Sequence, residues 1–245
     1  MSLSHNSSIS VSNLQLCLDA SNPRSYVGSG TSWVDVSGFS NIFAASDYTY
    51  PSIAGSGLQK YFTFINNGTT TNNIYSSTAN ITTYTQPQYT RIGWFYLTGT
   101  SASWSPIIQN SIGNNADMCL CIEGGKLTFH QYTNAGSGGT TSVDYSVQGT
   151  GSINTNTWYQ GAMVVDRTAN TVVLYINGVL DRSTSINVIG NSSSNTMVIG
   201  GATVDGYSGG RMFKGYIAQV FHYNTVLTAS DILQNFNAYR GRYGI

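Results

Sequence analysis

Apolar and polar residues alternate along much of this chain with the two-residue period of a β-strand. The segment Leu14-Gln-Leu-Cys-Leu-Asp19 is the first clear case, and residues 60–65 form the second. Such alternation turns one set of side chains toward a core and the other toward solvent. The same pattern recurs over residues 90–97, 105–109, 118–122, 126–132, 158–167, 171–176, 196–200 and 212–223. We therefore expect about a dozen short strands.

Short turn signals separate several of these strands. Gly124-Gly125 and Asn177-Gly178 are pairs that tolerate positive φ, so each predicts a two-residue hairpin turn. Residues 168–170 predict a third hairpin between 158–167 and 171–176. Consecutive strands joined this tightly run antiparallel.

Two stretches are less regular. Residues 20–41 are rich in turn formers, and Trp33 and Val36 are the side chains that we expect to anchor this stretch in the core. Residues 66–89 are a long connection rich in Thr and Asn. Connections of that length are uncommon in a compact domain, so this one is either a surface excursion or two short strands.

A single helix is predicted at the C-terminus. Thr228 is a good N-cap, and Asp231 three residues later completes an acidic version of the capping box. Gly241 is expected to end the helix. The apolar face of this helix consists of Ile232, Phe236 and Tyr239.

Many short strands with one short C-terminal helix predict an all-β protein, a two-sheet antiparallel jelly-roll sandwich. No break in composition marks a second domain, so residues 14–245 are expected to form one domain after a polar N-terminal arm, residues 1–13. A polar arm is usually disordered unless it is tied down. If the arm is ordered, we expect it to dock on a partner or a neighbouring subunit.

The composition narrows the range of partners and compartments. Charged residues make up 8% of the chain and the net charge is zero. No basic stripe is present for nucleic acid or for an anionic membrane. The arm has neither the charged nor the apolar region of a signal peptide, which predicts synthesis in the cytoplasm. The three cysteines, at positions 17, 119 and 121, are expected to be reduced and buried.

Catalytic carboxylates are scarce. Hydrolysis of a glycosidic bond requires two carboxyl groups on either side of that bond. Glu123 is the one glutamate, and no two of the nine aspartates alternate on a predicted strand. His130 and His222 lack the neighbours of a nucleophilic triad or a zinc site, so we interpret them as sheet residues. We expect that this protein is not an enzyme.

No resident cofactor is predicted. Asp117, Asp181 and Asp205 lie at loops or strand ends, where carboxylates and backbone carbonyls can hold Ca²⁺. None belongs to a ladder of Asp and Asn ligands, and the alternative for each is an Asx turn.

Several blocks of sequence resemble the laminin-G-like branch of the concanavalin A-like lectin/glucanase superfamily. They occur in the family's order and span the chain from about residue 14 to its end. The blocks are residues 16–26, 28–38, 158 with 172–178, and 213–224 running into 227–237. The first and last blocks are most similar to the version found in structural proteins of tailed bacteriophages. This architecture serves lectins, glycosidases, receptor-binding modules and inert spacers alike, so it implies a fold more strongly than a function.

The phage-like resemblance implies a virion structural protein, expected on the capsid or in the tail, neck or fibre. Its partners would be other virion proteins and further copies of itself. The alternative function is a lectin-like module that binds a polysaccharide of the host surface. Trp104, Tyr132 and Tyr207 lie in or beside Gly- and Ser-rich loops, where an aromatic ring can stack on a sugar. The alternative for these rings is packing on a sheet edge or at a subunit contact.

Overall fold

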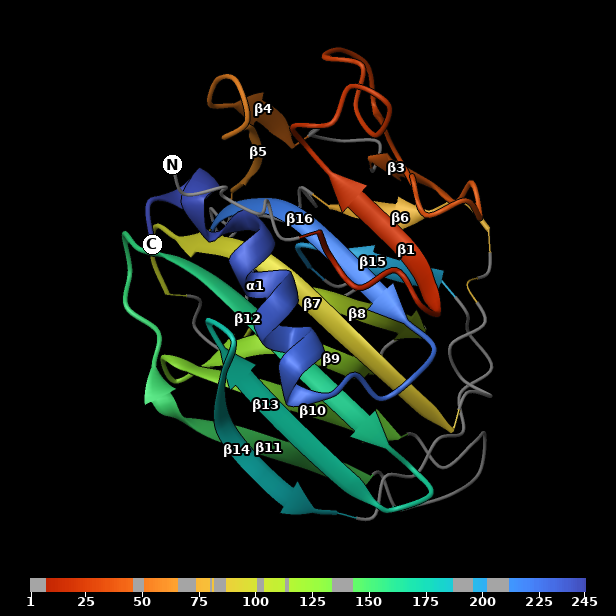
Figure 1. Cartoon of the computed structure of the whole chain (residues 1–245), viewed down its shortest axis with the longest axis vertical. Helices are drawn as coiled ribbons and strands as arrows, with labels where there is room; N and C mark the ends of the chain where they lie inside the picture. Colours follow the sequence, from red (N-terminus) through yellow and green to blue (C-terminus); the bar gives the residue numbers. More distant parts are fainter. Residues whose placement is uncertain are drawn as a thin grey trace, which may run out of the picture.

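The computed structural model describes residues 8–45, 51–65, 74–79, 81, 87–100, 104–112, 115–133, 143–186, 196–201 and 212–245. Two antiparallel β-sheets face each other, and one helix lies across the outer surface of the first sheet (Figure 1). The predicted all-β sandwich with a short C-terminal helix is therefore confirmed.

The first sheet carries the helix. Its strands follow the order β14-β13-β12-β7-β16-β5-β4, and β1 pairs with β16 beside β5. In this spatial order the strands are β14 (Val179–Ser185), β13 (Thr171–Ile176), β12 (Trp158–Asp166), β7 (Gln88–Leu97), β16 (Gly215–Tyr223), β5 (Tyr61–Phe64) and β4 (Ser52–Ala54), with β1 (Leu14–Asp19) at the side.

The second sheet forms the other layer of the sandwich and follows the order β11-β10-β9-β8-β15-β6-β3-β2. Its strands are β11 (Val143–Ser152), β10 (Lys126–Thr133), β9 (Asn115–Glu123), β8 (Trp104–Ile112), β15 (Thr196–Ile199), β6 (Tyr75–Ser77), β3 (Ile42–Ala45) and β2 (Ser32–Val34). The four strands β8 to β11 run as a continuous series of neighbours, and two residues each join β8 to β9 and β9 to β10.

The main core fills the space between the two sheets. In β7, Tyr89 and Phe95 belong to this core, whereas Ile92 and Trp94 belong to a second apolar cluster under the helix. Trp33 is fully buried in the main core, and Val36 packs against the second cluster, so both predicted anchors are confirmed. The two clusters arise because alternate residues of one strand point to opposite faces of the sheet.

The three predicted hairpin turns are confirmed, whereas four strands were not predicted. The pairs 124–125 and 177–178 both have positive φ, as a two-residue hairpin turn requires, and Asn170 at φ 53° closes the third predicted hairpin. Strands β2, β3 and β4 lie in stretches that we predicted as turns or left unassigned, and β11 was also missed. Three of these strands are three or four residues long, too short for a periodic signal.

The helix α1 spans Ala229–Tyr243 and begins as predicted. The Thr228 side chain accepts a hydrogen bond from the Asp231 backbone N–H, and the Asp231 side chain accepts one from the Thr228 backbone N–H. The predicted end at Gly241 is wrong, because Gly244 in the left-handed conformation closes the helix. Packing of Tyr243 extends the helix past Gly241 and offsets the roughly 1 kcal/mol that an interior glycine costs.

Aromatic stacking fixes the helix to the sheet. The Trp94 ring lies 5.7 Å from the Phe236 ring at an interplanar angle of 8°, and 4.5 Å from the Tyr243 ring at 26°. The Trp158 ring also lies 4.5 Å from Tyr243. Stacked pairs of this kind contribute about 0.5–1.5 kcal/mol each beyond the buried area. The last helical turn is thus held by the two tryptophans of β7 and β12.

Over its described part, the N-terminal arm contacts its own chain, and the docking on a partner or a neighbouring subunit that we expected stays a prediction. The Ser10 backbone N–H donates to Asn235 Oδ1 at 2.8 Å, and the Ser10 carbonyl accepts from the Tyr223 hydroxyl at 2.9 Å. Gln234 Nε2 donates to the Ser8 carbonyl at 2.7 Å. Hydrogen bonds to the helix and to β16 therefore tie down residues 8–10.

All three cysteines are free and buried, as predicted. Burial raises the pKa of Cys17 to about 12, with the nearby Asp19 and Asp35 carboxylates adding to the effect. His222 is buried in β16, where burial and the Arg91 guanidinium lower its pKa well below 6.5. His222 is therefore a neutral interior residue at physiological pH. In the described ranges, no helix is both long and apolar enough to cross a membrane.

The capping box gives a direct test of the helix. Thr228→Ala removes the side-chain acceptor of the N-cap, so we expect the free energy of unfolding to fall by about 1 kcal/mol. Ser230→Ala, an exposed change inside the same turn, should shift it by less than about 0.5 kcal/mol. Urea unfolding followed by tryptophan fluorescence measures both, and equal effects of the two variants would contradict the capping assignment.

Candidate functional site

The three aromatic residues predicted to bind sugar are not brought together by any described contact. Trp104 is the first residue of β8 and pairs in register with Glu123, while Tyr132 in β10 pairs with Asp144. The structure describes the backbone of these two residues and not their side chains, and Tyr207 lies outside the described residues. Their role in binding stays a prediction.

Asp181, one of the calcium candidates, forms hydrogen bonds between the two sheets. Its Oδ1 accepts hydrogen bonds from the backbone N–H of Thr150 at 3.1 Å and of Gly151 at 2.7 Å. These bonds join the edge strand β14 to β11. Asp117 lies in β9 with its side chain outside the described set, and Asp205 is not described. Among described residues, no three His, Cys, Asp or Glu side chains gather as metal ligands would.

A groove of about 700 Å³ lies beside the end of the helix. This volume is within the roughly 300–1,000 Å³ typical of small-ligand sites. Three separate parts of the chain form its walls: the arm, the loop 55–60 between β4 and β5, and the last turns of α1. The lining residues are Ser8, Ile9, Leu58, Gln59, Asn237, Ala238, Tyr239, Gly241 and Arg242.

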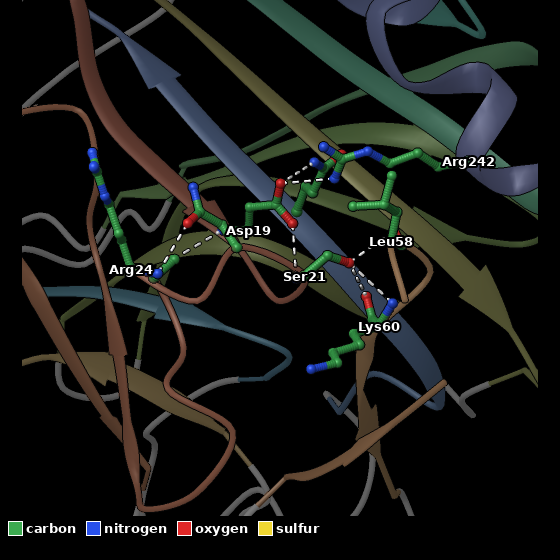
Figure 2. A network of polar contacts seen from close by, with 9 residues as sticks. Asp19, Ser21, Arg24, Leu58, Lys60 and Arg242 are labelled. Carbon is green, nitrogen blue, oxygen red and sulfur yellow. Dashed lines mark hydrogen bonds and ion pairs between the residues drawn. The ribbon is translucent and has the colours of Figure 1, made fainter. Parts of the chain in front are cut away.

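Asp19 does not line the groove itself, but it bonds Arg242, which does. Asp19 is the last residue of β1 and is 4% exposed. Its Oδ2 accepts hydrogen bonds from Arg242 Nη1 of the helix and from Gln219 Nε2 of β16, both at 2.8 Å (Figure 2). One buried carboxylate thus joins the first strand, a central strand and the end of the helix.

The same carboxylate reaches the β4–β5 loop through Ser21. Asp19 Oδ1 accepts a hydrogen bond from the Ser21 backbone N–H at 2.9 Å. The Ser21 hydroxyl donates to the Leu58 carbonyl at 2.8 Å and accepts from the Lys60 backbone N–H at 3.0 Å (Figure 2). These bonds hold the chain on both sides of Gln59, whose own side chain remains exposed at the groove.

Tyr239 and Arg242 form the polar part of the helical wall. The Arg242 guanidinium carbon lies 4.4 Å from the centre of the Tyr239 ring, and the Phe221 ring stacks on that ring at 5.9 Å. Burial raises the pKa of Tyr239 to about 12, with Cys17 and Asp19 adding to the shift and Arg242 opposing it. Its phenol is therefore neutral and can both donate and accept a hydrogen bond.

Gly241 leaves the groove open between these side chains. It lies inside the helix, and a Cβ built on it would meet no atom within 4 Å. The Tyr243 ring stacks on Trp94 and lies tilted against Trp158, and these contacts fix this turn and the groove residues on it. Tyr239 lies one turn before Tyr243 on the same face of the helix, so the aromatic packing beneath the helix also positions this wall of the groove.

Sequence reasoning missed most of the groove. We assigned Tyr239 to the apolar face of the helix, and it does pack against the second apolar cluster, but it is only half-buried and also lines the groove. Arg242 lies beyond that face of the helix and Asn237 lies beside it. Neither residue belongs to a sequence motif. A weak signal was available in Asp19, an acidic residue that directly follows three buried strand positions. Its partner is 223 residues away, a separation that no local pattern reveals.

The groove is equipped to bind a ligand rich in hydroxyl groups. Amide side chains of Gln59 and Asn237 each offer a donor and an acceptor, and the Tyr239 phenol offers both. The exposed side chain of Leu58, at 64%, adds an apolar surface at the rim. The fold is a two-sheet β-sandwich, and this groove is an open, largely polar hollow on its surface.

A laminin-G-type family model, described as the concanavalin A-like lectin/glucanases superfamily, matches residues 66–233, which is more than half of the chain. The chain therefore belongs to the concanavalin A-like lectin/glucanase superfamily. Among curated proteins, none matches its sequence.

Solved structures with the same fold include receptor-binding parts of clostridial toxins. The binding domain of Paraclostridial Mosquitocidal Protein 1 matches with a TM-score of 0.67 and 16% identity over 94% of this chain and 53% of that one. The binding domain of botulinum neurotoxin DC in complex with SialylT matches with 0.64 and 16% over 94% and 52%. Botulinum neurotoxin type C, whose cell entry is dependent upon interaction with two ganglioside molecules, matches with 0.64 and 15% over 93% and 51%.

These likenesses show a shared fold. The chain spans about half the length of each of these toxin structures. The sugars named with two of them are ligands of the longer proteins, so the matched half is not thereby assigned a ligand. Function must be argued from the groove itself.

The ion pair between Asp19 and Arg242 can be measured by a double-mutant cycle. Arg242→Met leaves a buried carboxylate without its cation, so we expect the free energy of unfolding to fall by about 2 kcal/mol, less than for a fully buried pair because Arg242 is 23% exposed. In an Asp19→Asn background the same change should cost much less. Additive effects in urea unfolding would contradict coupling between the two residues.

Proposed function

We propose that this protein is a non-catalytic carbohydrate-binding module and that its groove beside the helix end receives the glycan. The observation that carries the proposal is the lining of this groove. Neutral amides, a neutral phenol and an apolar rim meet in one open space of about 700 Å³. Sugars present hydroxyl groups that both donate and accept hydrogen bonds, together with apolar C–H surfaces, and such a lining complements both.

A binding role fits the acid–base chemistry of the chain better than hydrolysis does. The one glutamate, Glu123, lies at the end of β9, and its strand partners there are Trp104 and Lys126. Asp19 bonds the groove residue Arg242, and its two oxygens accept three hydrogen bonds within the protein, of which the one from Arg242 is also an ion pair. It is a structural carboxylate and is not positioned to donate a proton to a leaving group.

Filling the groove should weaken binding without harming the fold. Gly241→Gln places a long side chain in open space on a helix that favours glutamine over glycine, so the variant should be at least as stable as the wild type. Ser230→Gln, about three turns away on the exposed first turn, is the matched control.

We expect the wild type and Ser230→Gln to bind the same glycans on an array of bacterial polysaccharides, and Gly241→Gln to lose at least about tenfold in affinity, since a filled site costs more than 1.4 kcal/mol. Binding that Gly241→Gln leaves intact would place the glycan elsewhere. A silent array for the wild type would contradict the proposed function.

We also propose that the module is part of a bacteriophage virion, made in the host cytoplasm and assembled with other virion proteins and further copies of itself. The sequence blocks at both ends of the chain, which resemble phage structural proteins, support this proposal. The low charge, 8% with a net charge of zero, is compatible with assembly because little repulsion keeps copies apart. A sandwich exposed on the surface of the particle can be a structural part of the virion and bind a glycan at the same time.

Purified phage particles test whether this protein is part of the virion. Antibody against this chain should label virions in negative-stain microscopy, at the capsid, tail, neck or fibre. Unlabelled particles from a lysate that contains the protein would contradict the virion assignment and would leave the glycan-binding proposal untouched.

A further inference from the structure

We propose that the groove selects neutral glycans and discriminates against glycans that carry a carboxylate, such as uronic or sialic acids. This inference rests on the proposed function and names its ligand class. It follows from where the charges of the groove are placed and from what already neutralises them.

The charged side chain that lines the groove is already paired. Arg242 Nη1 lies 2.8 Å from Asp19 Oδ2, and the Asp19 side chain is 6% exposed. The guanidinium also lies over the Tyr239 ring at 4.4 Å, which keeps it along the wall. A ligand carboxylate placed near Arg242 would therefore also face the charge of Asp19. Like charges in a partly desolvated site repel, so the pair gives no net attraction for an anion.

The nearest other cations on the described chain face away. Lys60 follows the groove loop, but its ammonium group points away from Arg242 (Figure 2). Arg24 lies on the far side of Asp19, and its guanidinium extends outward from the network (Figure 2). Arg240 is exposed on the helix, over the Phe236 ring at 5.6 Å, and is not among the groove residues. An anionic sugar would thus lose water without gaining a free cation.

Neutral groups remain for recognition. Gln59 and Asn237 are exposed on facing walls, one on the β4–β5 loop and the other on the helix. Each amide can donate to one sugar hydroxyl and accept from another. Leu58 and Ile9 supply apolar surface for the C–H face of a sugar ring or for the methyl of an acetamido group. This combination of groups matches neutral hexoses and N-acetylhexosamines.

The test compares matched ligands on the whole protein. Titration calorimetry with a neutral hexose oligosaccharide and with the same oligosaccharide oxidised to the hexuronate measures the preference. We expect the wild type to bind the neutral form at least about tenfold tighter, and its affinity to be independent of salt between 50 mM and 500 mM, because no ion pair is formed.

A second variant tests the cause. Gln59→Lys adds an unpaired cation at an exposed position of the groove, so it should strengthen hexuronate binding about threefold to fivefold at low salt, an effect that salt then removes. Thr168→Lys adds the same charge on the exposed β12–β13 hairpin and should leave both affinities unchanged.

The outcomes separate this inference from the proposed function. Binding of the hexuronate equal to or tighter than the neutral form, lost in Gly241→Gln, would overturn neutral selectivity and keep the groove as the glycan site. Equal gains for Gln59→Lys and Thr168→Lys would show that overall charge acts, and would also overturn the inference. No binding of either oligosaccharide, together with a silent array, would count against glycan binding as such.

Discussion

The packing of the C-terminal helix on Trp94 and Trp158 is the contact on which the rest of the structure depends. It covers the outer face of the first sheet, which would otherwise expose a continuous apolar surface, and it extends α1 past the glycine at position 241. Because Tyr243 fixes the last turn of the helix, the groove residues on that turn are held as well. The position of the groove is a consequence of aromatic packing beneath it.

The polar contacts have a complementary role. Asp19 is nearly buried, yet hydrogen bonds from β16, from the helix and from the following turn satisfy it. In a chain with 8% charged residues, each buried charge must be matched individually, because few others are near. The hydrogen bonds of Asp19 to Arg242 and to Ser21 fix the position of the β4–β5 loop relative to the helix. The ion pair between Asp19 and Arg242 also leaves the groove without net charge. The ion pair between Asp19 and Arg242 thus stabilises the fold and also underlies the proposed ligand preference.

Membership of the lectin/glucanase superfamily explains the scaffold and leaves the function to the surface. The toxin structures with the same fold are about twice as long and at most 16% identical in the comparisons above. Sandwiches of this kind keep the inner faces of both sheets apolar and vary the loops and outer elements. In this chain the arm, the β4–β5 loop and the helix end lie outside the two inner faces, and together they form the groove.

The sequence by itself determined the strands with clear alternation, the hairpins at 124–125 and 177–178, the capping of the helix and the sandwich that these imply. Those features depend on neighbours within a few residues, so local pattern suffices. The tertiary structure decided the short strands β2, β3 and β4, the end of the helix, the docking of the described part of the arm and the groove. Most of these features depend on partners far apart in the sequence, such as Asp19 with Arg242, and no local periodicity encodes such a pairing, while the short strands have too few residues to show a period.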